Sequence, residues 1–228
     1  MIVMKKNQVK GILLMSMFVV INLLTDNAYA TNYQLVNVGE KLSLEIPKHW
    51  YSHSLSERRN ISAAGEAIVN SVTLNEPVFV SSLSISSRPE PAGGFIRVSY
   101  IPTETKAKQF YQKEFAFIVE TRRDEFLHEI ESAFAEQFNL LSKGSKGNGL
   151  NLLDHGPANI EKINGIYAMT YTYRRPSAYG SSPFKVKQYH IPLGVKKAIV
   201  TMSYRESQYI LFWPILEKVK NSILINNF

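Results

Sequence analysis

Two histidines four residues apart, His49 and His53, are residues whose type and spacing could do chemistry. On a helix this spacing would place both imidazoles on one face, where they could bind a metal ion such as zinc. Pro47 and the strand-like run before it favour a loop instead, and no glutamate in zincin spacing accompanies the pair. A metal-dependent envelope enzyme that uses His49 and His53 is therefore kept as an alternative function.

Other groupings of catalytic residue types are weaker. Asp154 and His155 could act as orienting acid and base, but adjacent side chains do not reach triad geometry, and no serine stands in a Gly-x-Ser-x-Gly elbow. The acidic residues between Asp124 and Glu131 are typical of a solvated helix surface rather than of paired catalytic carboxylates. No motif specifies a reaction, so we expect a protein that is not an enzyme and uses no cofactor.

A basic, tyrosine-rich stretch in the last third of the chain supplies candidate binding residues instead. Tyrosines alternate along the expected strand Ile166–Arg174, and Arg and Lys follow them closely. Aromatic rings interleaved with cations can bind sugars, anionic polymers or single-stranded nucleic acid, although such tyrosines more often belong to a half-buried sheet face. The candidate binding residues are Tyr171, Tyr173, Arg174, Arg175, Lys185, Lys187, Tyr189 and Arg205.

The first thirty residues have the pattern of an export signal. Lys5, Lys6 and Lys10 precede an apolar run from Gly11 to Leu24, and Ala28-Tyr-Ala30 follows as a small-x-small site. A run of 14 residues is shorter than the roughly 20 that span a bilayer. We therefore expect a signal peptide over residues 1–30, cleavage after Ala30, and a periplasmic or secreted protein of a Gram-negative bacterium with no membrane span.

Composition and charge limit the chemical classes of partner that we expect. The chain has no Cys, so an exported product would have neither a lipid anchor on cysteine nor disulfides. Without residues 1–30, 23 basic and 18 acidic residues remain, a net charge of +5, with −3 over residues 31–141 and +8 over residues 142–228. This asymmetry favours an acidic partner protein or an anionic envelope component. Nucleic acid is not expected outside the cytoplasm, and a secreted host-directed factor is a further alternative.

The N-terminal half of the expected mature chain combines strands with a long helical stretch. Gln34–Val38 and Leu42–Ile46 predict a hairpin, and Val78–Ser87 and Phe95–Ile101 alternate as strands with one buried face. Residues 103–141 lack Gly and Pro and predict helix. One helix of that length would run roughly 55 Å, longer than a domain of about 40 Å, so we expect two helices broken near Glu120–Arg123.

The C-terminal half predicts a meander. Leu152–Ile160 is an interrupted strand, Ile166–Arg174, Phe184–Ile191 and Lys197–Tyr204 follow as strands, and Pro214 fits the first position of a closing helix that ends near Asn226. Strands and helices do not alternate strictly, which argues against a doubly wound parallel sheet. The expected fold is α+β, an antiparallel sheet flanked by helices in a single domain over residues 31–228.

Both ends of this region are similar to a known family. Leu44-Glu-Ile-Pro-Lys-His-Trp50 resembles the strand, proline and tryptophan opening of the PsbP-like fold, the α/β/α sandwich shared with the small Ran-binding Mog proteins and with exported bacterial proteins. The segments Lys187–Leu193, Ala198–Ser207 and Pro214–Ile223 resemble its last strands and closing helix. The resemblance implies a binding, assembly or accessory role and supplies no catalytic residues.

Overall fold

The computed structural model describes residues 32–59, 81–88, 92–102, 111–143, 152–177 and 182–226. The expected signal peptide, residues 1–30, lies outside this part of the chain. All the helices and strands named below belong to one compact unit, Tyr33–Phe228.

An eight-stranded antiparallel sheet forms the centre of this unit, with the strand order β3-β4-β5-β10-β9-β8-β6 and β7 paired to β8. Three further strands form a small sheet in the order β1-β2-β11. The strands of the large sheet are β3 (Tyr51–Ser52), β4 (Leu83–Ser86), β5 (Gly94–Pro102), β6 (Asp154–His155), β7 (Asn159–Ile163), β8 (Ile166–Arg175), β9 (Phe184–Pro192) and β10 (Lys196–Arg205). Those of the small sheet are β1 (Tyr33–Val38), β2 (Leu42–Pro47) and β11 (Leu224–Ile225).

The helix α5 (Tyr209–Asn221), which follows the short 3-10 turn η2 (Glu206–Gln208), covers one face of the large sheet together with β2. Phe212, Leu216 and Val219 of α5 share a buried cluster with Val98 and Val200 of the sheet. We call this the α5-side face. It contains the largest apolar core, because alternate residues of β5, β8, β9 and β10 point to it.

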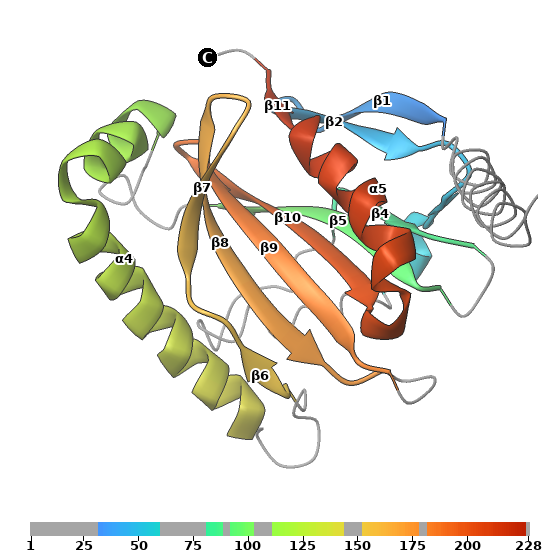
Figure 1. Ribbon diagram of the computed structural model, residues 1–228. Coiled ribbons are helices and arrows are strands. Elements are labelled where there is room, and N and C mark those ends of the chain that lie inside the picture. Colours follow the sequence, from blue (N-terminus) through green and yellow to red (C-terminus); the bar gives the residue numbers. More distant parts are fainter. Residues whose placement is uncertain are drawn as a thin grey trace, which may run out of the picture. The chain divides into compact units, whose positions relative to one another are not determined.

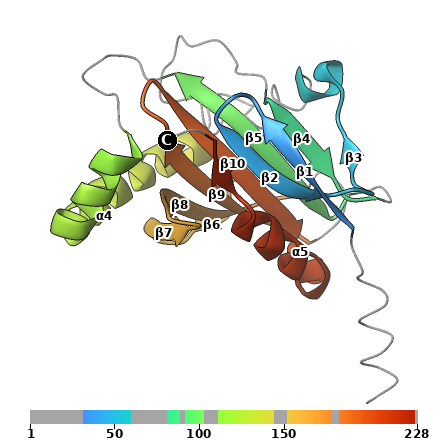
Figure 2. The ribbon, with the colours of Figure 1, turned by 90° about the horizontal axis from the view of Figure 1, so that it is seen from above.

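The helix α4 (Gln112–Lys143) packs on the opposite face, which we call the α4-side face. Its first half buries Phe115 against Ile160, and its second half buries Phe138 against Tyr173. The strands β8, β9 and β10 therefore lie between α4 and α5 (Figures 1 and 2).

The expected α+β class is confirmed, and so is the break in the long helix. Within α4, Arg122 has φ −142° and ψ 37°, which are not helical values, so two helical segments meet there. The start of the closing helix was predicted wrongly: α5 begins at Tyr209, with Pro214 inside it. Pro214 has no N–H to donate to the Ile210 carbonyl, and Ile210 is 84% exposed, so the helix tolerates the proline at a position open to solvent. The helix ends at Asn221, and Leu224–Ile225 pairs with β2 instead of extending it.

The helical residues 55–59 begin with a capping box that carries a pH signature. The Ser54 amide donates to Glu57 Oε2 at 2.7 Å, the Glu57 amide donates to Ser54 Oγ at 3.3 Å, and the Tyr51 hydroxyl donates to Glu57 Oε1 at 2.8 Å. These bonds favour the carboxylate, above all those from Ser54, and lower the pKa of Glu57 to about 2.

We expect NMR titration of Glu57 to show a midpoint near pH 2. Because the folded pKa lies below the ordinary value, the stabilisation is present above an unfolded pKa of about 4.3 and is lost as the pH falls through about 2. Replacing Ser54 by alanine should move the midpoint up towards the ordinary range. A wild-type midpoint near the ordinary value would contradict the capping box.

Candidate functional site

In the sequence, the candidate binding residues form one basic, tyrosine-rich set. In the structure they are divided between the two faces of the large sheet. Tyr171, Tyr173, Arg175 and Arg205 lie on the α4-side face, whereas Arg174, Lys185, Lys187 and Tyr189 lie on the α5-side face. The register decides this: Tyr189 pairs with Thr170, and Tyr171 pairs with Gln188. Partners opposite each other point to the same face, so Tyr189 and Tyr171 point to opposite faces. Tyr189 is buried on the α5-side face and does not lie beside Tyr171 and Tyr173.

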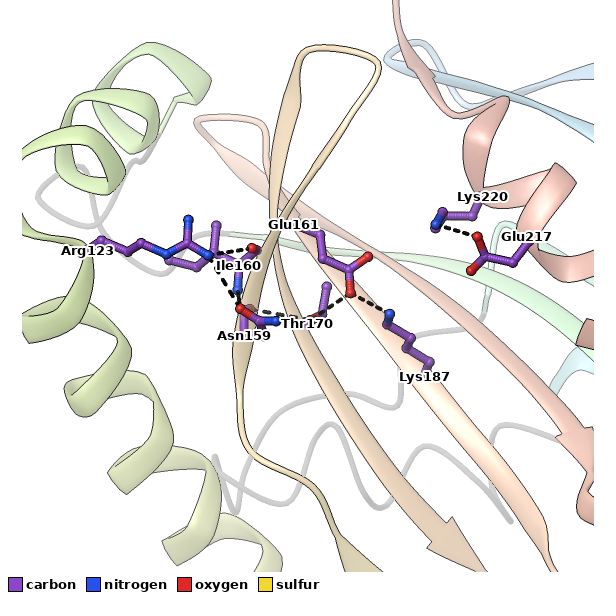
Figure 3. A network of polar contacts seen from close by, with 8 residues as sticks. All are labelled: Arg123, Asn159, Ile160, Glu161, Thr170, Lys187, Glu217 and Lys220. Atoms are coloured by element: carbon purple, nitrogen blue, oxygen red, sulfur yellow. Dashed lines mark hydrogen bonds and ion pairs between the residues drawn. The ribbon is translucent and has the colours of Figure 1, made fainter.

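On the α5-side face, two of the three candidate binding cations are paired with carboxylates. Arg174 donates to both oxygens of Glu206 at 2.8 and 2.9 Å and to Asp154 at 2.7 Å. Lys187 forms a close ion pair with Glu161 of β7, and Thr170 also donates to that carboxylate (Figure 3). The charges of this face are therefore largely balanced, and its arginine and Lys187 hold strands and η2 together.

The same close-up shows how the surrounding elements are tied to this network. Arg123 of α4 reaches the Ile160 carbonyl and the Asn159 side chain of β7, and Lys220 pairs with Glu217 within α5 (Figure 3). Neither Arg123 nor Lys220 forms a hydrogen bond or ion pair with Glu161 or Lys187. They leave the charge balance of the α5-side face unchanged.

The α4-side face presents a different arrangement at the end of β8, β9 and β10. Arg175, Phe184 and Arg205 stand side by side on three neighbouring strands. The guanidinium carbons of Arg175 and Arg205 lie 4.6 and 4.9 Å from the centre of the Phe184 ring, which is itself buried. Both cations therefore use the same aromatic ring as a platform.

A third arginine, Arg97 of β5, adds to this positive potential. Its register partner is Thr201 of β10, which places it on the α4-side face. Burial lowers the pKa of Arg175, and the charges of Arg97 and Arg205 lower it further. Arginine keeps its proton at neutral pH even so, because its ordinary pKa exceeds 12. The guanidinium groups thus repel one another while half-buried.

Polar and aromatic side chains continue this face along β8 and β9. Gln188 donates to the Tyr173 hydroxyl at 3.4 Å and lies 3.1 Å from His190 Nε2, and the ring of His190 packs edge-on against Tyr171 at 4.7 Å. Burial raises the pKa of Tyr173 to about 12, so its hydroxyl stays protonated. Burial and the charge of Lys197 lower the pKa of His190 well below its ordinary value, so that the imidazole is neutral.

Lys197 is a further cation of this face, at the opposite end of β10 from Arg205. Its register partner is Ile101, which places it on the α4-side face, and burial lowers its pKa. No carboxylate of the described residues forms an ion pair with Lys197 or with Arg175. We refer to Arg97, Arg175, Lys197 and Arg205 together as the basic face.

The strands of the large sheet contribute no acidic residue to the basic face. The eight strands of the large sheet contain two acidic residues, Asp154 and Glu161, and the register places both on the α5-side face. On α4, Glu131 accepts a hydrogen bond from the Ala158 amide and contributes to the raised pKa of Tyr171. The basic face therefore carries four cations and no strand carboxylate.

The two histidines expected as alternative metal ligands are not on a helix. The chain between them forms β3, His49 is exposed, and His53 Nε2 lies 3.0 Å from Ser86 Oγ. The two imidazoles are therefore not brought onto one helix face, which the proposed metal pair required. Within the described residues, no cluster of three or more His, Cys, Asp or Glu side chains could hold a metal ion.

The contact between Ser86 and His53 has the composition of a nucleophile and its base. Glu57 lies near this pair, because the charge of His53 contributes to the lowered pKa of Glu57. Ser86, however, has no exposed surface, so a substrate carbonyl could not approach its Oγ. The pair acts as a structural hydrogen bond between β3 and β4.

Arg97, Gln188, His190 and Lys197 are site residues that the sequence interpretation missed. The signal for them was present in the alternation. Arg97 stands out of phase with Ile96 and Val98, just as Lys197, Thr201 and Arg205 of β10 stand out of phase with the apolar residues of that strand. Ser84 and Ser86 of β4 follow the same pattern and are buried. Such alternation is usual for a sheet with one solvated face, and only the packing of α4 and the burial of these serines show that this polar face is partly covered.

Comparisons with known proteins give distant similarities of fold. No family model matches the chain, and no curated protein is similar to it. Among solved structures it is similar to cyanobacterial PsbP from Synechocystis sp. PCC 6803, with 11% identity, a TM-score of 0.45, and coverage of 86% of this chain and 94% of that one. It is also similar to LpqN, involved in cell envelope biogenesis of Mycobacterium tuberculosis, with 13% identity, a TM-score of 0.42, and coverage of 88% and 94%.

The Saccharomyces cerevisiae Ran-binding protein Mog1p is a further similar structure, with 11% identity, a TM-score of 0.40, and coverage of 86% of this chain and 96% of that one. The chain spans half the length of another, from Bacteroides thetaiotaomicron. PsbP and Mog1p represent the PsbP-like fold that the sequence was expected to resemble. Likeness at this identity concerns the fold and says nothing about function. Separately, none of the helices in the described ranges combines the length and the apolar character needed to cross a bilayer.

Proposed function

We propose that this protein is a non-enzymatic binding protein that holds an anionic ligand on its basic face. The observation that carries the proposal is the pair of guanidinium groups, Arg175 and Arg205, that share the buried Phe184 ring. The N-terminal sequence adds export to the proposal, so that the ligand would be met in the periplasm or outside the cell.

The balance of charge supports an anion as the ligand. Arg175 holds its charge while half-buried beside Arg97 and Arg205, which costs free energy, and a bound carboxylate or phosphate would offset that cost. Planar guanidinium groups can contact either group through two parallel hydrogen bonds. The Tyr173 hydroxyl, protonated because its pKa is raised to about 12, adds a neutral polar group beside Arg175.

The burial of these side chains favours a slender ligand over an acidic protein surface. Arg97, Arg175, Lys197 and Arg205 are each only partly exposed. A phosphate or uronate chain can reach half-buried guanidinium groups, whereas the flat surface of a folded partner contacts side chains that protrude. An anionic envelope polymer is therefore the ligand that we propose, with an acidic partner protein as the competing outcome.

The test measures binding of two defined polyanions, short-chain polyphosphate and oligogalacturonate, by titration calorimetry at low and high salt. We expect Arg175→Gln/Arg205→Gln to weaken binding of the preferred polyanion by about a hundredfold or more, because two charge-assisted contacts of about 1.5–3 kcal/mol each are lost. The matched control, Lys185→Gln/Lys218→Gln, removes the same charge from positions off the basic face and should change affinity less than twofold.

A preference for one probe identifies phosphate or carboxylate as the group recognised. Equal loss in both double variants would show that net charge alone drives binding and would overturn the site. If wild type binds neither polyanion but captures an acidic protein, the proposed polymer ligand is wrong and the acidic protein is the partner. Near-ultraviolet circular dichroism of each variant confirms that packing is retained.

A further inference from the structure

Three aromatic rings form a continuous cluster where β10 leads into α5, on the side of the sheet opposite the basic face. Tyr209 and Trp213 are stacked with ring centres 6.0 Å apart and planes 23° apart. Tyr204 contacts both rings, at 5.7 and 5.9 Å. Tyr204 is buried beneath the other two, whereas 49% of Tyr209 is exposed and Trp213 is partly exposed. The pair thus presents aromatic surface to solvent from two successive turns of one helix.

Charged groups of both signs border this cluster. Lys185 is the register partner of Tyr204 on β9, and Arg174 is the register partner of Lys185 on β8. Arg174 is held by Glu206 and Asp154 through the hydrogen bonds given above. Glu206 lies between Tyr204 and Tyr209 in the chain, and its charge contributes, after burial and Tyr209, to the raised pKa of Tyr204. Donors and acceptors are therefore fixed next to an aromatic surface.

The balance of these charges indicates what kind of ligand fits. Two cations, Arg174 and Lys185, face two carboxylates, Glu206 and Asp154, so a polyanion or an anionic bilayer would gain nothing here. A sugar ring offers an apolar face of C–H groups and a rim of hydroxyls that both donate and accept hydrogen bonds. Aromatic rings can pack against the C–H face, and mixed donors and acceptors can bond to the hydroxyls.

We propose that Tyr209 and Trp213, bordered by Lys185, Arg174 and Glu206, form a binding platform for a neutral carbohydrate. This platform is independent of the basic face, because it lies on the other side of the sheet and involves a different ligand chemistry. Either site can fail its test without affecting the other.

Tryptophan fluorescence of the whole protein tests the platform directly. The chain contains two tryptophans, and Trp50 is buried, so a ligand that stacks on the platform should change mainly the emission of Trp213. We would titrate cellotetraose, chitotetraose and maltotetraose separately. We expect a saturable change with at least one of them, and Tyr209→Ala should weaken that binding about tenfold, as expected for loss of one aromatic contact.

Ile210→Ala is the matched control. Ile210 neighbours Tyr209 on the same turn and is 84% exposed, but it contributes no ring to the platform. The Ile210→Ala variant should bind the oligosaccharide with the same affinity as wild type. No fluorescence change with any of the three sugars, or equal weakening by Tyr209→Ala and Ile210→Ala, would overturn the proposal. So would binding to phosphatidylcholine vesicles that Ile210→Ala abolishes, because the patch would then be a lipid contact.

Discussion

Replacing Phe115 by alanine is expected to lower the free energy of unfolding by about 3–5 kcal/mol. Phe115 has no exposed surface and attaches the first half of α4 to the sheet. Its ring packs edge-on against Phe126 at 5.7 Å and Tyr167 at 6.2 Å, so the substitution removes two aromatic contacts and leaves a cavity. The loss is measured by urea denaturation followed by circular dichroism.

Phe117 provides a control two residues away on the same helix. It is 66% exposed, so Phe117→Ala should change the free energy of unfolding by less than about 0.5 kcal/mol. Similar effects of the two substitutions would show that α4 is not attached through its Phe115 side. A loss confined to the signal of α4, with the sheet transition unchanged, would instead show that the helix unfolds separately.

Replacing Gly94 by alanine is expected to cost about 2–3 kcal/mol by overpacking. A Cβ at Gly94 would lie 2.7 Å from the Phe212 ring and 2.9 Å from the Trp50 ring. These two buried rings already contact each other edge-on at 6.0 Å, so neither can move without disturbing the core under α5. Thermal unfolding should show the loss as a lower Tm.

Gly156→Ala is the control for this substitution. A Cβ at Gly156 would meet its nearest atoms, in Thr172, at 3.9 Å, which is ordinary van der Waals contact. Its Tm should therefore stay close to that of wild type. If Gly94→Ala were equally harmless, the close approach of Trp50 and Phe212 to the start of β5 would be incorrect.

Much of the local structure could be predicted from the sequence. The hairpin β1–β2, the strands β5, β8, β9 and β10, and the break in α4 follow from alternation, turn residues and helix length, all of which act over a few neighbouring residues. The closing helix was predicted less well. Its start depends on how η2 packs against the sheet, and Pro214 was a misleading signal because proline is also tolerated early inside a helix whose freed carbonyl faces water.

The candidate site was harder to predict, because it depends on which residues of different strands lie opposite one another. A shift of one residue in register moves every side chain of a strand to the other face. Arg174 and Arg175 show the consequence. They are adjacent and chemically identical in the sequence, yet Arg174 is held by two carboxylates on one face, and Arg175 lies over Phe184 on the other.

The sequence by itself determined the α+β class, the order of most elements, and the excess of positive charge over residues 142–228. Composition and periodicity suffice for these properties, since each is a sum or a local pattern. Only the tertiary structure decided where the charge acts. The pairing of β8, β9 and β10 separates the neutralised cations beside Glu161 and Glu206 from the basic face around Phe184, because burial and ion pairing depend on contacts between residues distant in the chain.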